Sequence, residues 1–319
     1  MTRVTAPARL HFGLLNVPGD PDPTRRAFGG VGLMIEQPGV VVSVRPAETW
    51  QVEGPLASRA QEFALRFVAG LPEADRRPFQ VLVERCPEEH TGLGVGTALG
   101  LSVAKALAVE CGFGELSAVD LAARVGRGQR SAVGVHGFDR GGLIVEAGKL
   151  PGEVISPLVA GVAPPDEWRV VVVTPNAGGR WHGGREQRAF DSARVAPRID
   201  VTDVLCRIAL QGILPAAQGG DVLAFGEAVH EFNRRAGEPF AAAQGGVYAD
   251  PEVDALVRFL RAAGVRGVGQ SSWGPSVFAV LGSEDEALAC RARVAEVCRG
   301  GQVVVTRASR PRVTRHTGS

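Results

Sequence analysis

Apolar and polar positions recur regularly along most of the chain, so the expected elements can be set out by residue range. Alternating or β-branched apolar runs, typical of strands, occupy residues 40–44, 79–83, 143–145, 169–174, 277–281 and 303–306. Helical patterns occupy residues 98–111, 117–125, 201–214, 221–235, 251–263 and 283–298. In residues 98–111 the apolar positions cover nearly the whole circumference of the helix, which predicts a central, buried helix. We expect residues 126–142 to form a loop.

The order of these elements favours two domains. Strands and helices do not alternate strictly, which is typical of an α+β fold with mixed or antiparallel pairing. The stretch 162–167, with Pro164 and Pro165, is the best linker candidate. The sequence therefore predicts an N-terminal domain of residues 1–162 and a C-terminal domain of residues 163–319.

Composition narrows the class of protein further. The 319 residues are 45% hydrophobic and 22% charged, with a formal net charge of +1, so no basic field predicts a nucleic acid or membrane partner. The sequence has no signal-like start and no apolar run near the ~18 residues of a membrane span, and we expect a cytoplasmic protein. The five cysteines lack zinc-binding spacing and are expected to be buried free thiols.

A glycine-rich segment leads directly into the predicted buried helix. Its candidate ligand-binding residues are Gly92, Leu93, Gly94, Val95, Gly96 and Thr97. Glycines let the backbone approach an anion closely, and a helix N-terminus favours negative charge, so the segment predicts a phosphate or pyrophosphate site. The alternative is a tight strand-to-helix turn without a ligand. The segment is neither a Walker loop nor a dinucleotide fingerprint, and we expect no nicotinamide, flavin or haem.

Two further segments accompany this loop, residues 6–14 (APARLHFGL) and residues 267–275 (GVGQSSWGP). Together the three resemble the signatures of the GHMP superfamily, named for galacto-, homoserine, mevalonate and phosphomevalonate kinases. The resemblance covers nearly the whole chain. It implies a two-domain α+β fold of the GHMP type, with a ribosomal protein S5 domain 2-like N-terminal domain, a ferredoxin-like C-terminal domain and the ligand between them.

The sequence departs from the kinases at two positions. Their loop usually reads G-L-G-S-S-A, with serines that help to hold nucleotide phosphate and magnesium, and here Val95 and Gly96 replace them. The kinases' catalytic Asp lines up with Gly134, which has no side chain to act as a base. With these departures, the chain resembles the β-ribofuranosylaminobenzene 5′-phosphate synthase family in residues 9–11, 90–97, 126–131, 138–142 and 270–275.

That resemblance implies a defined reaction and two alternatives. Phosphoribosyl pyrophosphate and 4-aminobenzoate, or 4-hydroxybenzoate, would give an aryl C-riboside 5′-phosphate, carbon dioxide and pyrophosphate, as the first step towards a tetrahydromethanopterin-type cofactor. The alternatives are an ATP-dependent GHMP small-molecule kinase and a ligand sensor without catalysis on the same scaffold.

The segments that carry the resemblance supply the candidate binding residues. Guanidinium groups bind carboxylates and phosphates through two parallel hydrogen bonds. The candidates outside the glycine loop are Arg9, Arg127, Arg130, Ser131, Gln270, Ser271, Ser272 and Trp273. Phe12, Phe138 and Trp273 could form walls against an aromatic ring, with a place in the core as the alternative for each.

His11, His90 and Asp139 are the candidate catalytic residues. The two histidines, and His136, could exchange protons near neutral pH, and Asp139 could bind magnesium that bridges pyrophosphate oxygens. A structural histidine and a surface-turn aspartate are the alternatives, and the metal ligands stay unknown. The glycine-rich basic segment 176–185 could form a lid or simply be a mobile loop. The oligomeric state stays open, with a homodimer as one option.

Overall fold

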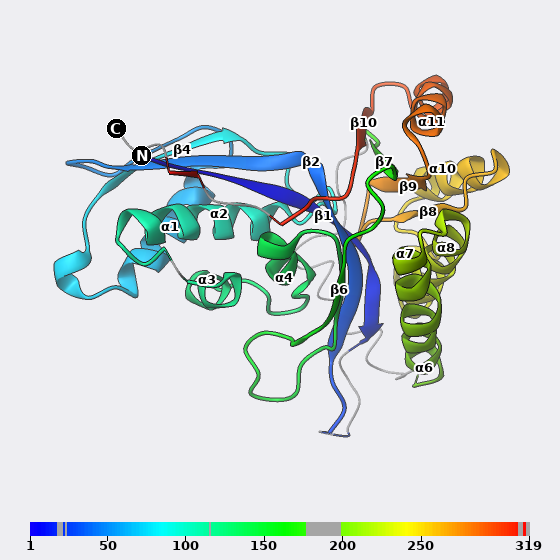
Figure 1. Ribbon diagram of the computed structural model, residues 1–319, viewed down its shortest axis with the longest axis horizontal. Helices are drawn as coiled ribbons and strands as arrows, with labels where there is room; N and C mark the ends of the chain where they lie inside the picture. Colours follow the sequence, from blue (N-terminus) through cyan, green and yellow to red (C-terminus); the bar gives the residue numbers. More distant parts are fainter. Residues whose placement is uncertain (18–21, 23, 115, 177–198, 312–314, 317–319) are drawn as a thin grey trace.

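The computed structural model describes residues 1–17, 22, 24–114, 116–176, 199–311 and 315–316 (Figure 1). The segment proposed as a lid, residues 176–185, lies outside these ranges except for its first residue. The described residues form two sheets with helices packed against them, which confirms the predicted α+β class.

The first sheet is built on two long antiparallel strands. Within the described residues it contains β1 (Thr2–Asn16), β2 (Phe28–Pro46), β3 (Gln51–Glu53), β4 (Phe79–Arg85), β5 (Leu143–Glu146), β6 (Leu158–Val162) and β11 (Arg315–His316). β1 pairs with β2 from Thr2 opposite Val44 to Asn16 opposite Phe28. β2 also pairs with β4 along one part of its length and with β5 along another. The length of β1 carries Arg9 and His11 to the junction with the second sheet.

Helices cover one face of this sheet (Figure 1). They are α1 (Ala57–Ala69), α2 (Val95–Glu110), α3 (Ala118–Val125) and α4 (Val133–Arg140), with a short 3₁₀ turn at Glu73–Asp75. α2 is buried along nearly its whole length, as its apolar circumference predicts. Ser117 and Asp120 form the predicted capping box at the start of α3.

The expectation of a loop over residues 126–142 is wrong, because α4 forms inside it. Its apolar positions are few and two glycines interrupt them, so the local pattern is weak. Burial of Val133, Val135 and Phe138 against α2, α3 and the sheet stabilises the helix instead. Tertiary packing therefore overrides low local propensity here.

The second sheet has the order β10-β7-β9-β8 and is antiparallel throughout. Its strands are β7 (Arg169–Thr174), β8 (Gly267–Gln270), β9 (Val277–Leu281) and β10 (Gln302–Thr306). Its helices are α6 (Ile199–Ile208), α7 (Leu214–Gly219), α8 (Val222–Gly237), α9 (Ala241–Gln244), α10 (Pro251–Ala262) and α11 (Glu284–Val297), with a π-helical segment at Ala209–Ile213 and a 3₁₀ turn at Glu238–Phe240. All six predicted strands and all six predicted helical patterns coincide with elements of the structure.

One hydrophobic cluster joins the two halves. Phe12 of β1 contacts Phe278 of β9, with ring centroids 5.0 Å apart, and lies near Phe225 of α8 at 6.4 Å. The chain leaves the first sheet at Val162 and enters the second at Arg169, and β11 later returns to pair with β1 beside the N-terminus (Figure 1). The halves thus share a core, and the division at residue 162 stays a prediction.

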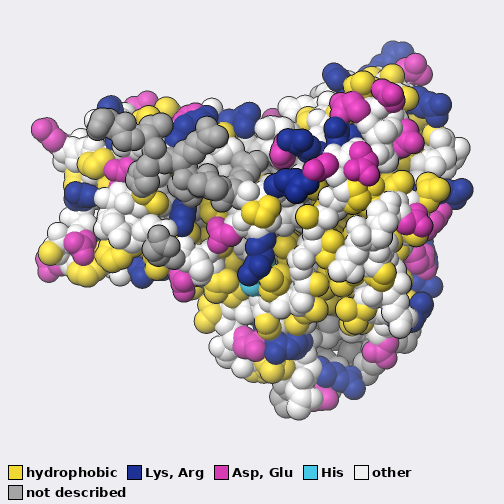
Figure 2. Space-filling model, in the orientation of Figure 1, with side chains coloured by type: hydrophobic (Ala, Val, Ile, Leu, Met, Phe, Trp, Pro, Cys, Tyr) yellow, Lys and Arg dark blue, Asp and Glu magenta, His cyan; other side chains and the backbone are white. Residues whose placement is uncertain are grey.

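Charged side chains of both signs lie on the surface of the molecule. Figure 2 shows acidic and basic side chains interspersed over the face in view, without a single basic field. Among the described residues, no helix combines the length and apolarity needed to cross a bilayer.

All five cysteines are free, but only Cys290 is buried and the others are half-buried, which corrects the expectation that all would be buried.

Candidate functional site

A cavity of about 500 Å³ opens where β1, the glycine-rich loop, α8 and the β8–β9 loop meet. It brings together most of the residues that the sequence predicted as ligand-binding. Those that line it are Arg9, His11, His90, Gly92, Leu93, Gly94, Val95, Gly96, Thr97, Arg127, Arg130, Ser131, Gln270, Ser272 and Trp273. Ser271 lies directly behind this lining, and Asp139 is not part of it.

The glycine-rich loop ends in the first turn of α2. Gly94 is the residue that precedes the helix and has a left-handed backbone, with φ of 71°. A Cβ atom at this position would lie 3.1 Å from Cβ of Arg9 and 3.2 Å from its Nε, so a side chain would press on that arginine. Because the first N–H groups of a helix lack intrahelical acceptors, this turn presents donors to an anion in the cavity.

Ser271 ties the three sequence segments together. Its hydroxyl donates to the carbonyl of Gly92 at 2.7 Å and accepts from the backbone N–H of His11 at 3.0 Å. Backbone hydrogen bonds from Ser272 N–H to His11 O (2.9 Å) and from Arg9 N–H to Leu93 O (3.0 Å) complete the junction. Ser271 is fully buried, so its described contacts are structural.

Asn233 is a site residue that sequence reasoning missed. Its amide donates to the carbonyls of Phe12 (2.6 Å) and Gln270 (2.8 Å), and its Oδ1 accepts from Gln270 N–H at 2.9 Å. The side chain therefore joins β1 to β8 at the wall of the cavity. A single Asn inside a helical pattern gives no signal of such a role, because its partners lie on strands far away in the sequence.

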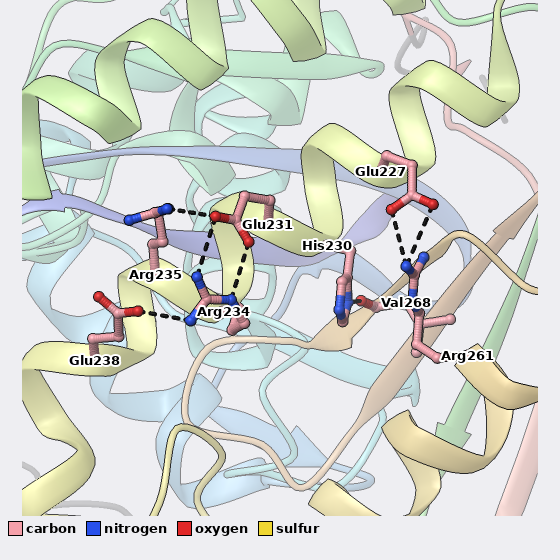
Figure 3. A network of polar contacts seen from close by, with 8 residues as sticks. All are labelled: Glu227, His230, Glu231, Arg234, Arg235, Glu238, Arg261 and Val268. Carbon is pink, nitrogen blue, oxygen red and sulfur yellow. Dashed lines mark hydrogen bonds and ion pairs between the residues drawn. The ribbon is translucent and has the colours of Figure 1, made fainter.

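α8 is held in place by polar contacts on its other faces (Figure 3). His230 shares a hydrogen bond of 2.8 Å with the carbonyl of Val268, and Arg261 of α10 pairs with Glu227 at 2.9 Å. Glu231 pairs with Arg234 at 3.0 Å, one turn along the same helix. The contacts of His230 and Glu227 fix the position of α8 against β8 and α10, and hence the position of Asn233, while the Glu231–Arg234 pair stabilises the helix itself.

Four arginines line the cavity, and those beside the glycine-rich loop are Arg9, near Gly94, and Arg59 and Arg127, near Gly96. Three of them, Arg9, Arg127 and Arg130, were predicted, and Arg59 of α1 was not. Nη2 of Arg127 lies 3.3 Å from Oγ1 of Thr97, within the first turn of α2. The helical pattern of α1 was not recognised in the sequence, so nothing marked Arg59 as part of this group. The concentration of guanidinium groups makes this end an anion-binding region.

The two predicted catalytic histidines both line the cavity. His11 is 4% exposed, and burial, with the nearby positive charge of Arg9, holds its pKa well below the usual value for histidine. It is therefore a neutral imidazole at neutral pH. His90 has a left-handed backbone, with φ of 63°, in the turn before the glycine-rich loop.

Besides Ser271, three residues proposed from the sequence lie outside the cavity lining. The carboxylate of Asp139 accepts a hydrogen bond from the backbone N–H of Ala118 at 3.0 Å, at the start of α3. Nε2 of His136 bonds the carbonyl of Ser156 at 2.7 Å, and Phe138 packs in the core of the first half. The structure thus gives Asp139 a contact that supports a helix, in place of the expected position beside the glycine loop.

The other end of the cavity is aromatic. Trp273 packs edge-on against Phe240, with ring centroids 4.8 Å apart and an interplanar angle of 67°. Gln270 fixes the loop that carries Trp273, since its amide donates to Ser272 O and accepts from Ala249 N–H, both at 2.8 Å. Tyr248 also lines this end, and burial raises its pKa to about 12. Its phenol is therefore neutral at neutral pH.

Comparison with known proteins identifies the fold to which this architecture belongs. Residues 213–300 match the family described as GHMP kinases C terminal. The fold is similar to homoserine kinase from Cytophaga hutchinsonii, with a TM-score of 0.70 and 16% identity over 98% of this chain and 97% of that one. It is also similar to mevalonate pyrophosphate decarboxylase from Streptococcus pyogenes, with a TM-score of 0.65 and 13% identity over 98% of each chain. The protein therefore has the GHMP fold, as the resemblance implied.

Two curated relatives define the family more closely. The chain is 32% identical to a protein from Methanothermobacter thermautotrophicus named Beta-ribofuranosylphenol 5′-phosphate synthase, over 95% of both chains. It is 29% identical to a protein of the same name from Archaeoglobus fulgidus, over 89% of this chain and 88% of that one. The chain belongs to the beta-ribofuranosylphenol 5′-phosphate synthase family and is an enzyme of this type.

Proposed function

We propose that the enzyme transfers the phosphoribosyl group of phosphoribosyl pyrophosphate to 4-hydroxybenzoate or 4-aminobenzoate with decarboxylation. The observation that carries the proposal is the two-ended cavity, in which a glycine-rich loop with four arginines faces an aromatic end. An anionic donor and an aromatic acceptor match these two ends. Because the curated relatives are named for a phenol product, 4-hydroxybenzoate is the acceptor to test first. The product would serve synthesis of a methanopterin-type cofactor.

The proposed reaction is balanced without any further reactant. The bond from ribosyl C1 to the pyrophosphate oxygen breaks, and pyrophosphate takes the electron pair. The ring carbon that bears the carboxylate bonds to C1, and loss of carbon dioxide returns its electron pair to the ring. Negative charge therefore grows on pyrophosphate in the transition state, where fixed donors are most effective.

Each end of the cavity has a role in this scheme. The first turn of α2 and the arginines beside it would bind the pyrophosphate and stabilise its departure. Trp273 and Phe240 would hold the aryl ring and keep water from the ribosyl cation. Neutral His11, which is buried and near Arg9, would act as an uncharged hydrogen-bonding group and not as an acid.

We further propose that Mg²⁺ enters with phosphoribosyl pyrophosphate, bound to its phosphate oxygens. Magnesium usually retains waters and binds substrate phosphates with few protein ligands. Among the described residues, no group of three or more His, Cys, Asp or Glu side chains could hold a metal ion, and Glu89, the carboxylate in the cavity lining, pairs with Arg59. Chelation with EDTA should lower turnover, and excess Mg²⁺ should restore it.

The proposed reaction has a direct test. 4-Hydroxybenzoate or 4-aminobenzoate labelled at the carboxyl carbon should release labelled carbon dioxide only when phosphoribosyl pyrophosphate is present, in a 1:1 ratio with pyrophosphate. Mass spectrometry should find a riboside that lacks the carboxyl group. Release of label without the donor, or a riboside that keeps its carboxylate, would exclude the proposal.

An ATP-dependent small-molecule kinase is the second candidate, because homoserine kinase shares the fold. The site lacks two groups that the kinases use. Val95 and Gly96 stand where they carry serines, and Gly134 stands where they carry an Asp. Loss of a general base typically lowers a rate by ~10²–10⁴. We therefore expect no ATP-dependent phosphorylation of homoserine, mevalonate or galactose above background.

A further inference from the structure

One of the four arginines of the cavity forms an ion pair with the acidic residue of the lining. Arg59 extends from α1, and Nη1 of its guanidinium contacts a carboxylate oxygen of Glu89 in the segment before the glycine-rich loop. The two side chains are 31% and 21% exposed, so both can reach the cavity while most of their surface is covered. The guanidinium also lies over the ring of Phe63, 5.8 Å from its centroid, which orients it on the helix.

The second terminal nitrogen of this guanidinium, Nη2, lies near the first turn of α2. Nη2 of Arg59 would be 2.8 Å from a Cβ atom built on Gly96, and Nη2 of Arg127 would be 3.4 Å from the same point. Two cations from separate elements therefore converge on one glycine of the anion-binding turn. Two guanidinium groups near the same point repel each other, and an anion close to both of them would offset that repulsion. A glycine at position 96 leaves room for that approach.

We infer that Arg59 binds the pyrophosphate group of the donor, and that Glu89 is its counter-ion in the free enzyme. This inference rests on the proposed function and identifies the pyrophosphate end of the substrate by residue. When pyrophosphate binds, the guanidinium contacts phosphate oxygens beside Arg127 and the α2 turn. Glu89 then opposes binding in two ways, because it competes for Arg59 and repels the anion.

The inference predicts opposite effects for the two partners of one ion pair. Arg59→Gln should weaken binding of inorganic pyrophosphate by about 10- to 100-fold, the usual loss for a charge-assisted hydrogen bond. Glu89→Gln should strengthen it by about three- to tenfold, because an acidic group near the anion is removed. If the pair only stabilised the fold, both changes would weaken binding.

Isothermal titration calorimetry of the purified full-length chain tests this with inorganic pyrophosphate and, separately, ribose 5-phosphate. Ribose 5-phosphate affinity should stay within about twofold in both variants. Arg66→Gln is the matched control, because it removes the same charge from the last turn of the same helix and is not part of the cavity lining. Thermal midpoints by circular dichroism report whether each variant is folded.

The outcomes separate the inference from the function on which it rests. If the unmodified protein binds no pyrophosphate, the proposed function fails and the inference fails with it. If it binds pyrophosphate but Arg59→Gln has no effect, or both variants weaken binding, only the role of Arg59 is overturned. Equal weakening of ribose 5-phosphate and pyrophosphate in Arg59→Gln would also overturn the assignment to the pyrophosphate end.

Discussion

Gly134 offers a perturbation in which size and charge can be separated. It lies in the first turn of α4, and a Cβ atom there would be 3.4 Å from Cγ2 of Thr97 and 3.6 Å from Cδ of Arg9. These are ordinary van der Waals distances, so a small side chain fits without displacing the glycine-rich loop. An Asp at this position, the residue of the kinases, would place a carboxylate next to Arg9.

The expected magnitudes follow from that geometry. Gly134→Ala should raise the free energy of unfolding by ~0.5–1 kcal/mol, because alanine is favoured over glycine inside a helix and nothing clashes. Gly134→Asp should pair with Arg9 and withdraw it from phosphate, which would weaken binding of phosphoribosyl pyrophosphate by about 10- to 150-fold, corresponding to ~1.5–3 kcal/mol. Gly134→Asn, of similar size but uncharged, should stay within about threefold of Gly134→Ala.

Urea unfolding and calorimetry with phosphoribosyl pyrophosphate measure these effects, and an ATP-coupled assay tests the kinase reaction. Gly134→Asp alone should create no kinase activity, since Val95 and Gly96 still lack hydroxyl groups. Equally tight binding of the donor by Gly134→Asp and Gly134→Asn would contradict a pairing of this carboxylate with Arg9. Robust ATP turnover by the unmodified protein with such an alcohol would instead favour the kinase reaction over phosphoribosyl transfer.

Two further predictions concern stability. Asn233→Ala should lower the free energy of unfolding, measured in urea, by ~2–4 kcal/mol, because it removes hydrogen bonds to buried backbone groups of Phe12 and Gln270. A loss below ~1 kcal/mol would contradict the bridging role of Asn233. The pKa of His11 is lower in the folded protein than in the unfolded chain, so the unfolded chain takes up the proton first as pH falls. The contribution of neutral His11 to the free energy of unfolding is therefore present above the ordinary pKa of 6.5 and is lost below it, by at most ~1.4 kcal/mol per pH unit. His230 shares this direction, so the test compares wild type with His11→Gln at pH 7.5, 6.5 and 5.5, and identical pH slopes would show that His11 does not titrate as described.

The sequence determined the elements whose patterns are strong and local. The apolar circumference of residues 98–111 and the capping box at Ser117 predicted α2 and α3, because burial and capping act within a few turns. The glycine-rich loop and the segments around Arg9 and Ser272 were found because special backbone conformations and motif residues are visible in the chain itself. Their grouping in one cavity followed from the family resemblance.

The remaining features depend on contacts between residues that are distant in the sequence. α4 forms through burial that its own pattern does not predict, and Asp139 turns to the start of α3, where it accepts a hydrogen bond from Ala118. Arg59 and Asn233 lie 174 residues apart, on helices that precede and follow the glycine-rich loop, and no local pattern encodes their proximity. Side-chain hydrogen bonds and charge pairs are set by the packing of whole elements, so these residues could be identified only once β1, α1 and α8 had been placed together.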